Sequence, residues 1–138
     1  MNIKLLGLFC FLCLVYFIGF RIDVMDIDAA QYASISREMF TSRNYLQVYD
    51  HGKDYLDKPP FLFWISALSM KIFGVNNFSY RFPSFLFSML AVYATYKFSL
   101  LYYAEKIAIL SALMLATCQA FFLMNHDVRT DTILMGFV

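Results

Sequence analysis

Charge is scarce in this chain of 138 residues. Charged side chains make up 15% of the chain, and the formal net charge is +1. Nucleic-acid binding needs a clustered basic face, which so few and balanced charges do not provide. We therefore expect no nucleic-acid partner.

Cysteine and histidine are also rare, which limits the metal and redox chemistry that the sequence predicts. All three cysteines, Cys10, Cys13 and Cys118, lie inside apolar runs, where a thiol packs as a small hydrophobic group. His51 and His126 each stand alone, and a lone histidine is more often a surface or packing residue than a ligand. The cysteines are therefore expected to be packing residues, and no cluster of cysteine and histidine indicates a metal centre.

Apolar residues, in contrast, are abundant. They make up 61% of the chain, and aromatic residues 20%, more than a soluble domain of this size normally carries. This composition predicts an all-α, polytopic membrane protein in contact with membrane lipids. A spanning helix needs about 20 residues, and we expect spans at about 4–20, 83–103 and 107–124, with the start of a fourth at 132.

The apolar runs at the two ends of the chain are both shorter than a typical spanning helix. The apolar run 5–20 has sixteen residues, close to the lower limit of about 17 for a spanning helix, and a cleavable signal peptide is the rival interpretation. No small-x-small cleavage site follows Phe20, so an uncleaved span is favoured. The last apolar run, 133–138, has only six residues, and we expect the chain to be the N-terminal part of a longer protein.

Between the first two spans lies a polar interval, 21–81, which contains seven of the ten acidic residues. Its first helix is expected at 28–40, with Asp28 as a candidate N-cap and Gln31 three residues later, as in a capping box. Apolar side chains recur at helical spacing on one face of this segment. We expect the helix to lie along the membrane interface rather than cross the bilayer.

A second interfacial helix is expected at 61–73. Pro59-Pro60 suits the first turn of a helix, where backbone N–H groups have no intrahelical partner, and Gly74 ends it. Thirteen residues are too few to cross a membrane. The connection 41–56 is polar and is expected to be an irregular loop.

The side of the membrane on which this interval lies can be argued from its charges. The interval carries seven Lys and Arg residues, so a positive-inside count favours the cytoplasm, although that count weakens for loops of about 60 residues.

Four motifs in the right order resemble those of bacterial lipid-linked-sugar glycosyltransferases. The resemblance is strongest to the aminoarabinose transferases of lipid A and to the related protein O-mannosyltransferases. The motifs are Asp28-x-x-x-Tyr32-Ala33-x-Ile35-x-Arg37-Glu38-Met39, Asp57-Lys58-Pro59-Pro60-Phe61-x-x-Trp64, Phe73-Gly74 and Arg81-x-Pro83-Ser84.

The resemblance implies a GT-C fold in the inner (plasma) membrane, with an active site that faces a long extracytoplasmic first loop. It therefore places 21–81 outside the cytoplasm, against the charge count. It also implies a polyprenyl-phosphate-linked sugar as donor, a lipid or protein as acceptor, and inversion at the sugar carbon. The fragment alone would then lack activity, because the lipid and acceptor cavities need more spans.

Two catalytic residues and one phosphate-binding residue follow from the resemblance. Asp28 matches the family's first-loop aspartate, and Asp131 matches an acidic residue of the second external loop. Glycosyl transfer needs a carboxylate to take or orient the acceptor proton and a cation to steady the departing phosphate, which Asp28 and Lys58 could supply. The simpler alternatives are that Asp28 only caps a helix, worth about 1 kcal/mol, and that Lys58 is a solvated interfacial lysine.

Further candidates are carried over in the same way. Asp57 matches the acidic residue that helps to hold a metal in the aminoarabinose enzymes, which makes a divalent metal a possible cofactor. Tyr32, Arg81 and Asp26 are candidates for substrate binding.

The chain also departs from the family pattern. The family often has Glu after the first Asp and Arg before the Tyr, where this chain has Ala29 and Gln31. These changes bear on donor or acceptor preference.

A non-enzymatic membrane module, either a scaffold or part of a transporter, is the alternative function. Charges that line a path inside the membrane would favour a transporter. Here the charges gather in loops, which favours the transferase.

Overall fold

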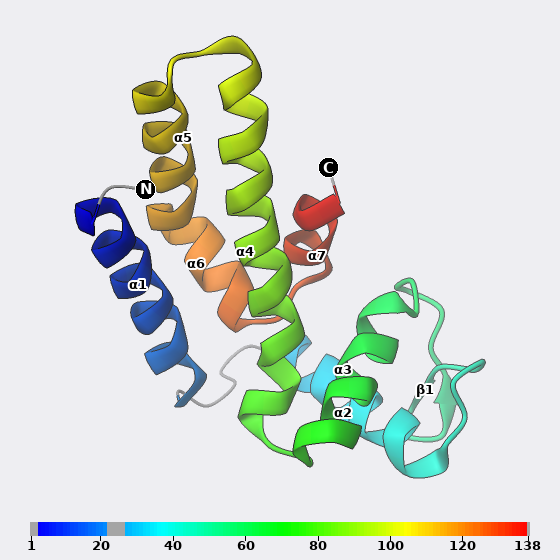
Figure 1. Ribbon diagram of the computed structural model, residues 1–138. Helices are drawn as coiled ribbons and strands as arrows, with labels where there is room; N and C mark the ends of the chain where they lie inside the picture. The colour runs from blue at the N-terminus through cyan, green and yellow to red at the C-terminus, as the bar shows by residue number, and fades with distance from the viewer. Residues whose placement is uncertain (1–2, 22–26, 138) are drawn as a thin grey trace.

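The computed structural model describes residues 3–21 and 27–137, and most of them are helical (Figure 1). The elements in chain order are α1 (Ile3–Ile18), the 3-10 turn η1 (Gly19–Arg21), α2 (Ile27–Ser42), β1 (Tyr49–Asp50), β2 (Lys53–Asp54), α3 (Phe61–Phe73), α4 (Asn77–Tyr102), α5 (Glu105–Thr117), α6 (Gln119–His126) and α7 (Thr130–Phe137).

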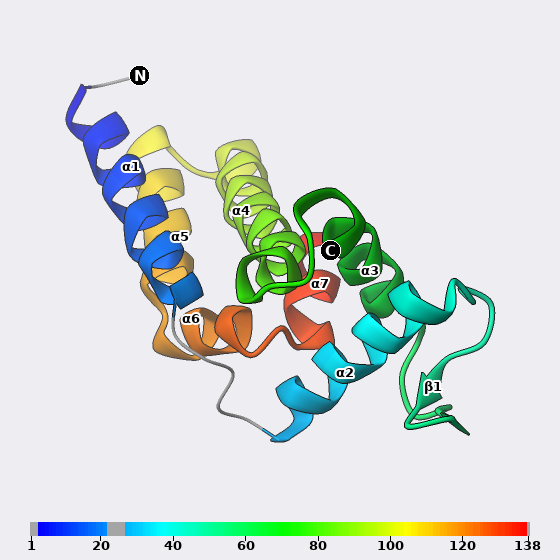
Figure 2. The ribbon, with the colours of Figure 1, turned by 90° about the horizontal axis from the view of Figure 1, so that it is seen from below.

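The elements form two layers. Helices α1, α4 and α5 run side by side, whereas α2, α3 and the short hairpin lie across the end of α4 where that helix begins (Figures 1 and 2). Each layer has its own apolar core. The first is centred on Tyr16, Ala91, Val92, Ala116 and Phe121, and the second on a larger group that includes Tyr32, Ile35, Phe63, Tyr80 and Val128.

Helix α4 is long and apolar enough to cross a membrane, by length and composition. It begins at Asn77, earlier than the expected span start at 83, because Asn76 and Ser79 form a capping box. The Ser79 N–H donates to Asn76 Oδ1 over 2.7 Å, and the Asn76 N–H donates to Ser79 Oγ over 3.2 Å. Pro83 therefore lies inside the helix rather than at its start.

The helix that the sequence predicts as continuous over 107–124 is broken. Helices α5 and α6 pass the same length and hydropathy test only as a pair, and they are bent by 52°. Cys118 between them is extended, and the Thr117 hydroxyl donates to the Leu113 carbonyl at 2.8 Å. Such back-bonding by threonine bends helices, which a hydropathy pattern does not reveal.

The connection expected to be irregular contains a small antiparallel hairpin, so the chain is not purely helical. Tyr49 pairs with Asp54 and Asp50 with Lys53. The turn residues His51 and Gly52 have φ of 51° and 76°, the left-handed values that a type I′ turn requires at both central positions.

Helix α2 packs one face against α3, as its apolar spacing predicts. Ala29, Tyr32, Ile35, Ser36 and Met39 are buried, while Arg37 and Thr41 are exposed. Helix α3 covers the expected residues 61–73, and Gly74 at its end has φ of 78°. The placement of both helices along a membrane interface remains a prediction.

The end of α1 approaches α6 so closely that a glycine is required there. A Cβ on Gly19 would overlap Nε2 of His126, whose ring packs against Phe122 with centroids 4.2 Å apart. A Cβ on Gly7 would meet nothing within 4 Å. Position 19 therefore requires glycine, whereas position 7 has room for a side chain.

We expect Gly19→Ala to destabilise the fold by about 1–3 kcal/mol, the usual cost of overpacking. Gly7→Ala should instead be neutral or stabilise by about 0.5–1 kcal/mol, because alanine favours a helix. Thermal unfolding in detergent micelles measures both. The loss should shrink in a His126→Ala background, and an equal loss there would show that the two residues are not in contact.

Candidate functional site

Three aromatic rings join α2 to the segment that carries the Asp57-Lys58-Pro59-Pro60 motif. Phe63 of α3 is fully buried, and its ring lies 5.9 Å from the rings of both Tyr32 and Tyr55. The side chains of Tyr32 and Tyr55 are also hydrogen-bonded. Two motifs that are separated in sequence therefore meet at Tyr55.

The environment of Tyr55 places Asp57 at the same junction. The pKa of Tyr55 is raised to about 12, first by burial and then by the nearby Tyr32 and the carboxylates of Asp57 and Asp50. Tyr55 therefore stays neutral at physiological pH and keeps its hydroxyl hydrogen.

Asp28 lies in the first turn of α2, not at its N-cap, because the helix already begins at Ile27. Its side chain is 57% exposed, and its Oδ2 atom lies 4.0 Å from Nη1 of Arg129. Gln31, expected to complete a capping box, instead donates from Nε2 to Asp50 Oδ2 at 2.6 Å. The capping-box prediction was wrong, since a tertiary contact takes up the Gln31 amide.

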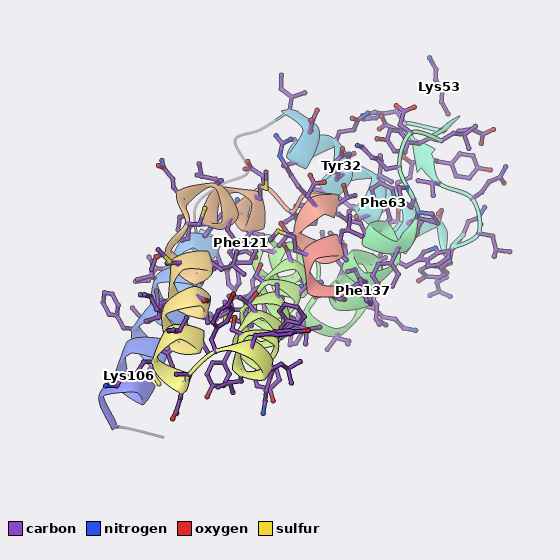
Figure 3. All side chains as sticks on the ribbon, turned by 90° about the horizontal axis from the view of Figure 1, so that it is seen from above. Tyr32, Lys53, Phe63, Lys106, Phe121 and Phe137 are labelled. Carbon is purple, nitrogen blue, oxygen red and sulfur yellow. The ribbon has the colours of Figure 1, made fainter. Side chains whose placement is uncertain are left out.

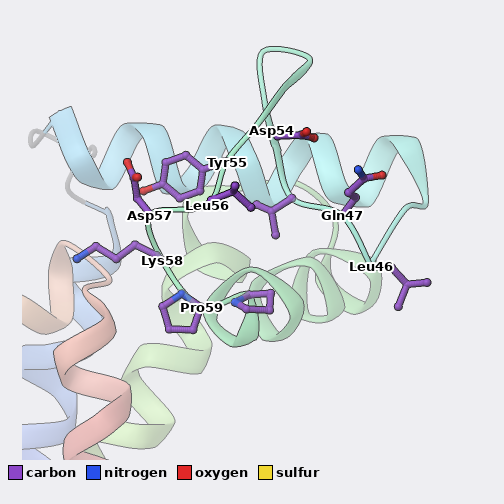
Figure 4. A pocket seen from close by; sticks show the side chains of 10 residues that line it. Leu46, Gln47, Asp54, Tyr55, Leu56, Asp57, Lys58 and Pro59 are labelled. Atoms are coloured by element: carbon purple, nitrogen blue, oxygen red, sulfur yellow. The ribbon is translucent and has the colours of Figure 1, made fainter.

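Asp57 and Lys58 line a pocket of about 470 Å³ between the hairpin and the start of α3 (Figure 4). Tyr55, Pro59 and Pro60 form part of its wall, and both charged side chains are exposed. Carboxylate and ammonium groups thus lie beside an open pocket. Tyr32, which contacts Tyr55 in the pocket wall, follows Asp28 by one turn of α2.

The pocket does not fit a metal by its protein ligands. Among the described residues, no group of three or more histidine, cysteine, aspartate or glutamate side chains could hold an ion. Asp54 lines the same pocket as Asp57, but two carboxylates do not complete a site, so Asp57 as a ligand stays a prediction and we derive no chemistry from a metal.

The remaining candidates lie at different distances from this junction. Asp131 is exposed in the first turn of α7, and Asp26 falls outside the described residues. Arg81 is 2% exposed, and its Nη1 donates to the Gly19 carbonyl at 3.0 Å, so its guanidinium points into the protein interior. The structure therefore places Tyr32 of α2 against the segment that carries Asp57 and Lys58, whereas the Arg81 guanidinium is buried against the Gly19 carbonyl.

Two residues near the junction were not expected from the sequence. Arg129 reaches Asp28 from the turn between α6 and α7. Glu38 accepts the backbone N–H groups of His51 and Gly52 at 2.9 and 3.0 Å, which holds the hairpin turn against α2. Only its place in the family-like motif singled out Glu38, and nothing local to the sequence pairs it with the turn.

At both positions where the chain departs from the family pattern, the residue makes a specific contact in the structure. Ala29 is 1% exposed, and its carbonyl accepts the Tyr80 hydroxyl at 2.9 Å, so a longer side chain has no room there. Gln31, as described, holds Asp50 of the hairpin.

The arrangement of the helices is found in known structures. A crystal structure of ArnT from Cupriavidus metallidurans in the apo state matches 95% of this chain with a TM-score of 0.86 and 25% identity, and the match covers 25% of the ArnT chain. A crystal structure of ArnT from the same organism, bound to undecaprenyl phosphate, matches 94% with a TM-score of 0.76 and 21% identity. The fold is therefore of the GT-C class of membrane glycosyltransferases.

The sequence comparisons identify the family within that class. The family model described as dolichyl-phosphate-mannose-protein mannosyltransferase matches residues 57–138, and the chain belongs to this family. The family consists of integral membrane proteins.

Curated relatives agree with this assignment. The undecaprenyl phosphate-alpha-4-amino-4-deoxy-L-arabinose arabinosyl transferase of Wigglesworthia glossinidia brevipalpis is 38% identical over 106 residues, and that of Enterobacter sp. (strain 638) is 36% identical over 108 residues. These matches cover 76% and 78% of this chain and 19% of each relative. The chain thus spans about a fifth of the length of the curated relatives that it matches.

The raised pKa of Tyr55 leads to a prediction about how the free energy of unfolding depends on pH. The hydrogen bond to Tyr32 should make Tyr55→Phe less stable by about 1 kcal/mol at neutral pH. An unfolded tyrosine ionises near pH 10.0 and the folded Tyr55 near 12, so the contribution of Tyr55 is complete below pH 10.0 and is lost as the pH rises towards 12.

Chemical unfolding of both proteins at neutral pH and between pH 10.0 and 12 measures this difference. The gap in unfolding free energy between the original chain and Tyr55→Phe should narrow with rising pH. A gap that stays constant would show that Tyr55 is not held neutral by its surroundings.

Proposed function

We propose that this chain forms the donor-binding and catalytic face of a glycosyltransferase. The reaction moves a sugar from a polyprenyl phosphate, with inversion, to a lipid or protein acceptor on the extracytoplasmic side of the inner membrane. The observation that supports the proposal is the junction at Tyr32 and Tyr55, which joins the helix that carries Asp28 to the segment that carries Lys58; both charged side chains are exposed. The names of the relatives support a donor of the undecaprenyl phosphate type.

The proposed roles follow from the charges at the junction. The acceptor hydroxyl attacks the sugar carbon, the bond between that carbon and the phosphate oxygen breaks, and the hydroxyl proton passes to a base. Asp28, exposed in the first turn of α2, takes or orients that proton. Lys58 stabilises the charge on the departing lipid phosphate.

Asp131 has a supporting role in this proposal. It lies exposed in the first turn of α7, two residues after Arg129, which contacts Asp28. A second carboxylate there would help to orient the acceptor.

The choice between Asp28 and Asp26 as the catalytic carboxylate is testable. Asp28→Asn keeps the size of the side chain and removes the charge, so it should leave folding nearly intact and lower the transfer rate about 100-fold or more. Asp26→Asn should lower the rate much less. The measurement is loss of sugar from undecaprenyl phosphate-linked 4-amino-4-deoxy-L-arabinose, in membranes from cells that produce a full-length enzyme carrying this segment, because the segment alone is expected to be inactive. At equal abundance, an active Asp28→Asn variant beside an inactive Asp26→Asn variant would reverse the assignment.

The side of the membrane is tested at the hairpin. Lys53 is exposed in β2 and tolerates a cysteine, whereas Gly52 beside it has a φ of 76° that strains any side chain. Lys53→Cys, in a background without the three native cysteines, should react with an impermeant thiol reagent added to intact cells whose outer membrane has been permeabilised. A cysteine replacing Lys106, an exposed residue in the first turn of α5, should react only after lysis, and the opposite pattern would put the hairpin in the cytoplasm.

A further inference from the structure

Helix α3 is apolar on both of its faces. Its inner face packs into the core, where Phe63 lies against Tyr32 of α2 (Figure 3). On its outer face Trp64, Leu68 and Ile72, which follow one another at intervals of one helical turn, are 41%, 56% and 66% exposed. A helix with apolar residues all round is normally buried, so we expect an apolar partner on the outer face of α3.

A turn of the preceding connection forms a pocket with this outer face. The Trp64 indole N–H donates to the Tyr45 carbonyl at 2.6 Å, which fixes the turn against α3. The Asn44 side chain accepts the N–H group of Leu46 at 3.3 Å and stiffens the turn itself. The pocket has a volume of about 380 Å³ and is lined by Tyr45, Leu46, Trp64, Leu68 and Lys71. Of these residues, only Leu46 also lines the pocket described above.

The wall of this second pocket suits a hydrocarbon chain. Leu46 and Leu68 contribute branched apolar side chains, and the Leu46 side chain is 94% exposed. The polar atom of the Trp64 indole is already bonded to the Tyr45 carbonyl, so the ring can meet an apolar ligand without leaving a donor unpaired.

One charged side chain, that of Lys71, also lines this pocket. Lys71 lies in the last turn of α3, it is exposed, and it forms no ion pair with any of the described residues. Lysine binds phosphate groups as a point charge. An apolar ligand with an anionic head group therefore complements the pocket in both polarity and charge.

The bilayer contains ligands of this kind next to α3. Phe73 at the end of α3 packs on Phe78 and Phe82 of α4, with ring centroids 5.4 and 5.3 Å apart. Helix α4 is the one that is long and apolar enough to cross a membrane, so α3 ends beside the start of that helix. Tryptophan, with an apolar ring and one polar end, is enriched at this level of membrane proteins.

We propose that the pocket between the turn at 45–46 and the outer face of α3 binds an anionic phospholipid of the surrounding membrane. One acyl chain lies against Leu46, Trp64 and Leu68, and the phosphate lies at the Lys71 ammonium. The site differs from general contact with the bilayer, because it selects a lipid by the charge of its head group. It takes no part in the proposed transfer reaction and does not depend on it.

The test uses the fluorescence of Trp64, which is the only tryptophan of the chain and therefore reports on this pocket alone. The complete chain is placed in vesicles of equal parts phosphatidylglycerol, which is anionic, and phosphatidylcholine, which has no net charge. Bromine atoms on acyl chains quench tryptophan on contact, and they are carried by one lipid in the first sample and by the other lipid in the second. We expect brominated phosphatidylglycerol to occupy the site in about fivefold preference, the effect of one lysine near an anionic lipid.

Variants assign this preference to the pocket. Lys71→Gln should abolish it, so that both brominated lipids quench equally, whereas Lys71→Arg should keep it. Lys53→Gln is the matched control, because it removes an exposed lysine of β2 that does not line the pocket, and it should keep the preference. Leu68→Ser should reduce quenching by both lipids, since it makes the wall polar. All these side chains are exposed, so circular dichroism should show intact folding.

Three results would overturn the proposal. Equal quenching by the two lipids in the original chain would mean general contact with the bilayer and no selective site. Quenching by acrylamide in water, but by neither brominated lipid, would place the pocket outside the membrane. A preference for phosphatidylglycerol that persists in Lys71→Gln would show that Lys71 does not hold the head group.

Discussion

The contact of Tyr32 and Tyr55 on the buried ring of Phe63 is the constraint on which the site depends. A membrane helix bundle does not determine where a polar connection of this length lies. The three rings do so, because they bury apolar area and satisfy the two tyrosine hydroxyl groups at one point. Without that point, Asp28 and Lys58 would belong to independent segments.

Much of the layer that contains α2 and α3 was predictable, because the sequence features that begin and end these helices are local. Helix α3 has the expected bounds, since two prolines precede it and a glycine with positive φ ends it. Helix α2 extends the expected 28–40 by one residue at its start and two at its end. The break at Cys118 and the hairpin were missed for a common reason: hydropathy reports how apolar a segment is, not whether a threonine hydroxyl or a distant carboxylate competes for its backbone groups.

The residues of the candidate site also fall into those that the sequence predicts and those that it does not. Asp28, Asp57 and Lys58 belong to motifs that can be recognised in the sequence, and the structure adds the contact of Tyr32 with Tyr55 between the two motifs. Arg129 reaches Asp28 only because Val128 adopts an unusual φ inside a core built from four helices. Arg81 is the opposite case: it belongs to a recognisable motif, but its guanidinium is buried against the Gly19 carbonyl, and its role in substrate binding stays a prediction.

The hairpin that Glu38 holds has a mechanical consequence. Its turn is fastened to α2 by two N–H groups, Gln31 fastens Asp50, and the Tyr55 N–H continues the ladder to the Val48 carbonyl at 2.8 Å. These hydrogen bonds hold the hairpin rigidly against α2. Any displacement of the hairpin would therefore also move Asp54 and Tyr55 in the wall of the pocket beside Lys58.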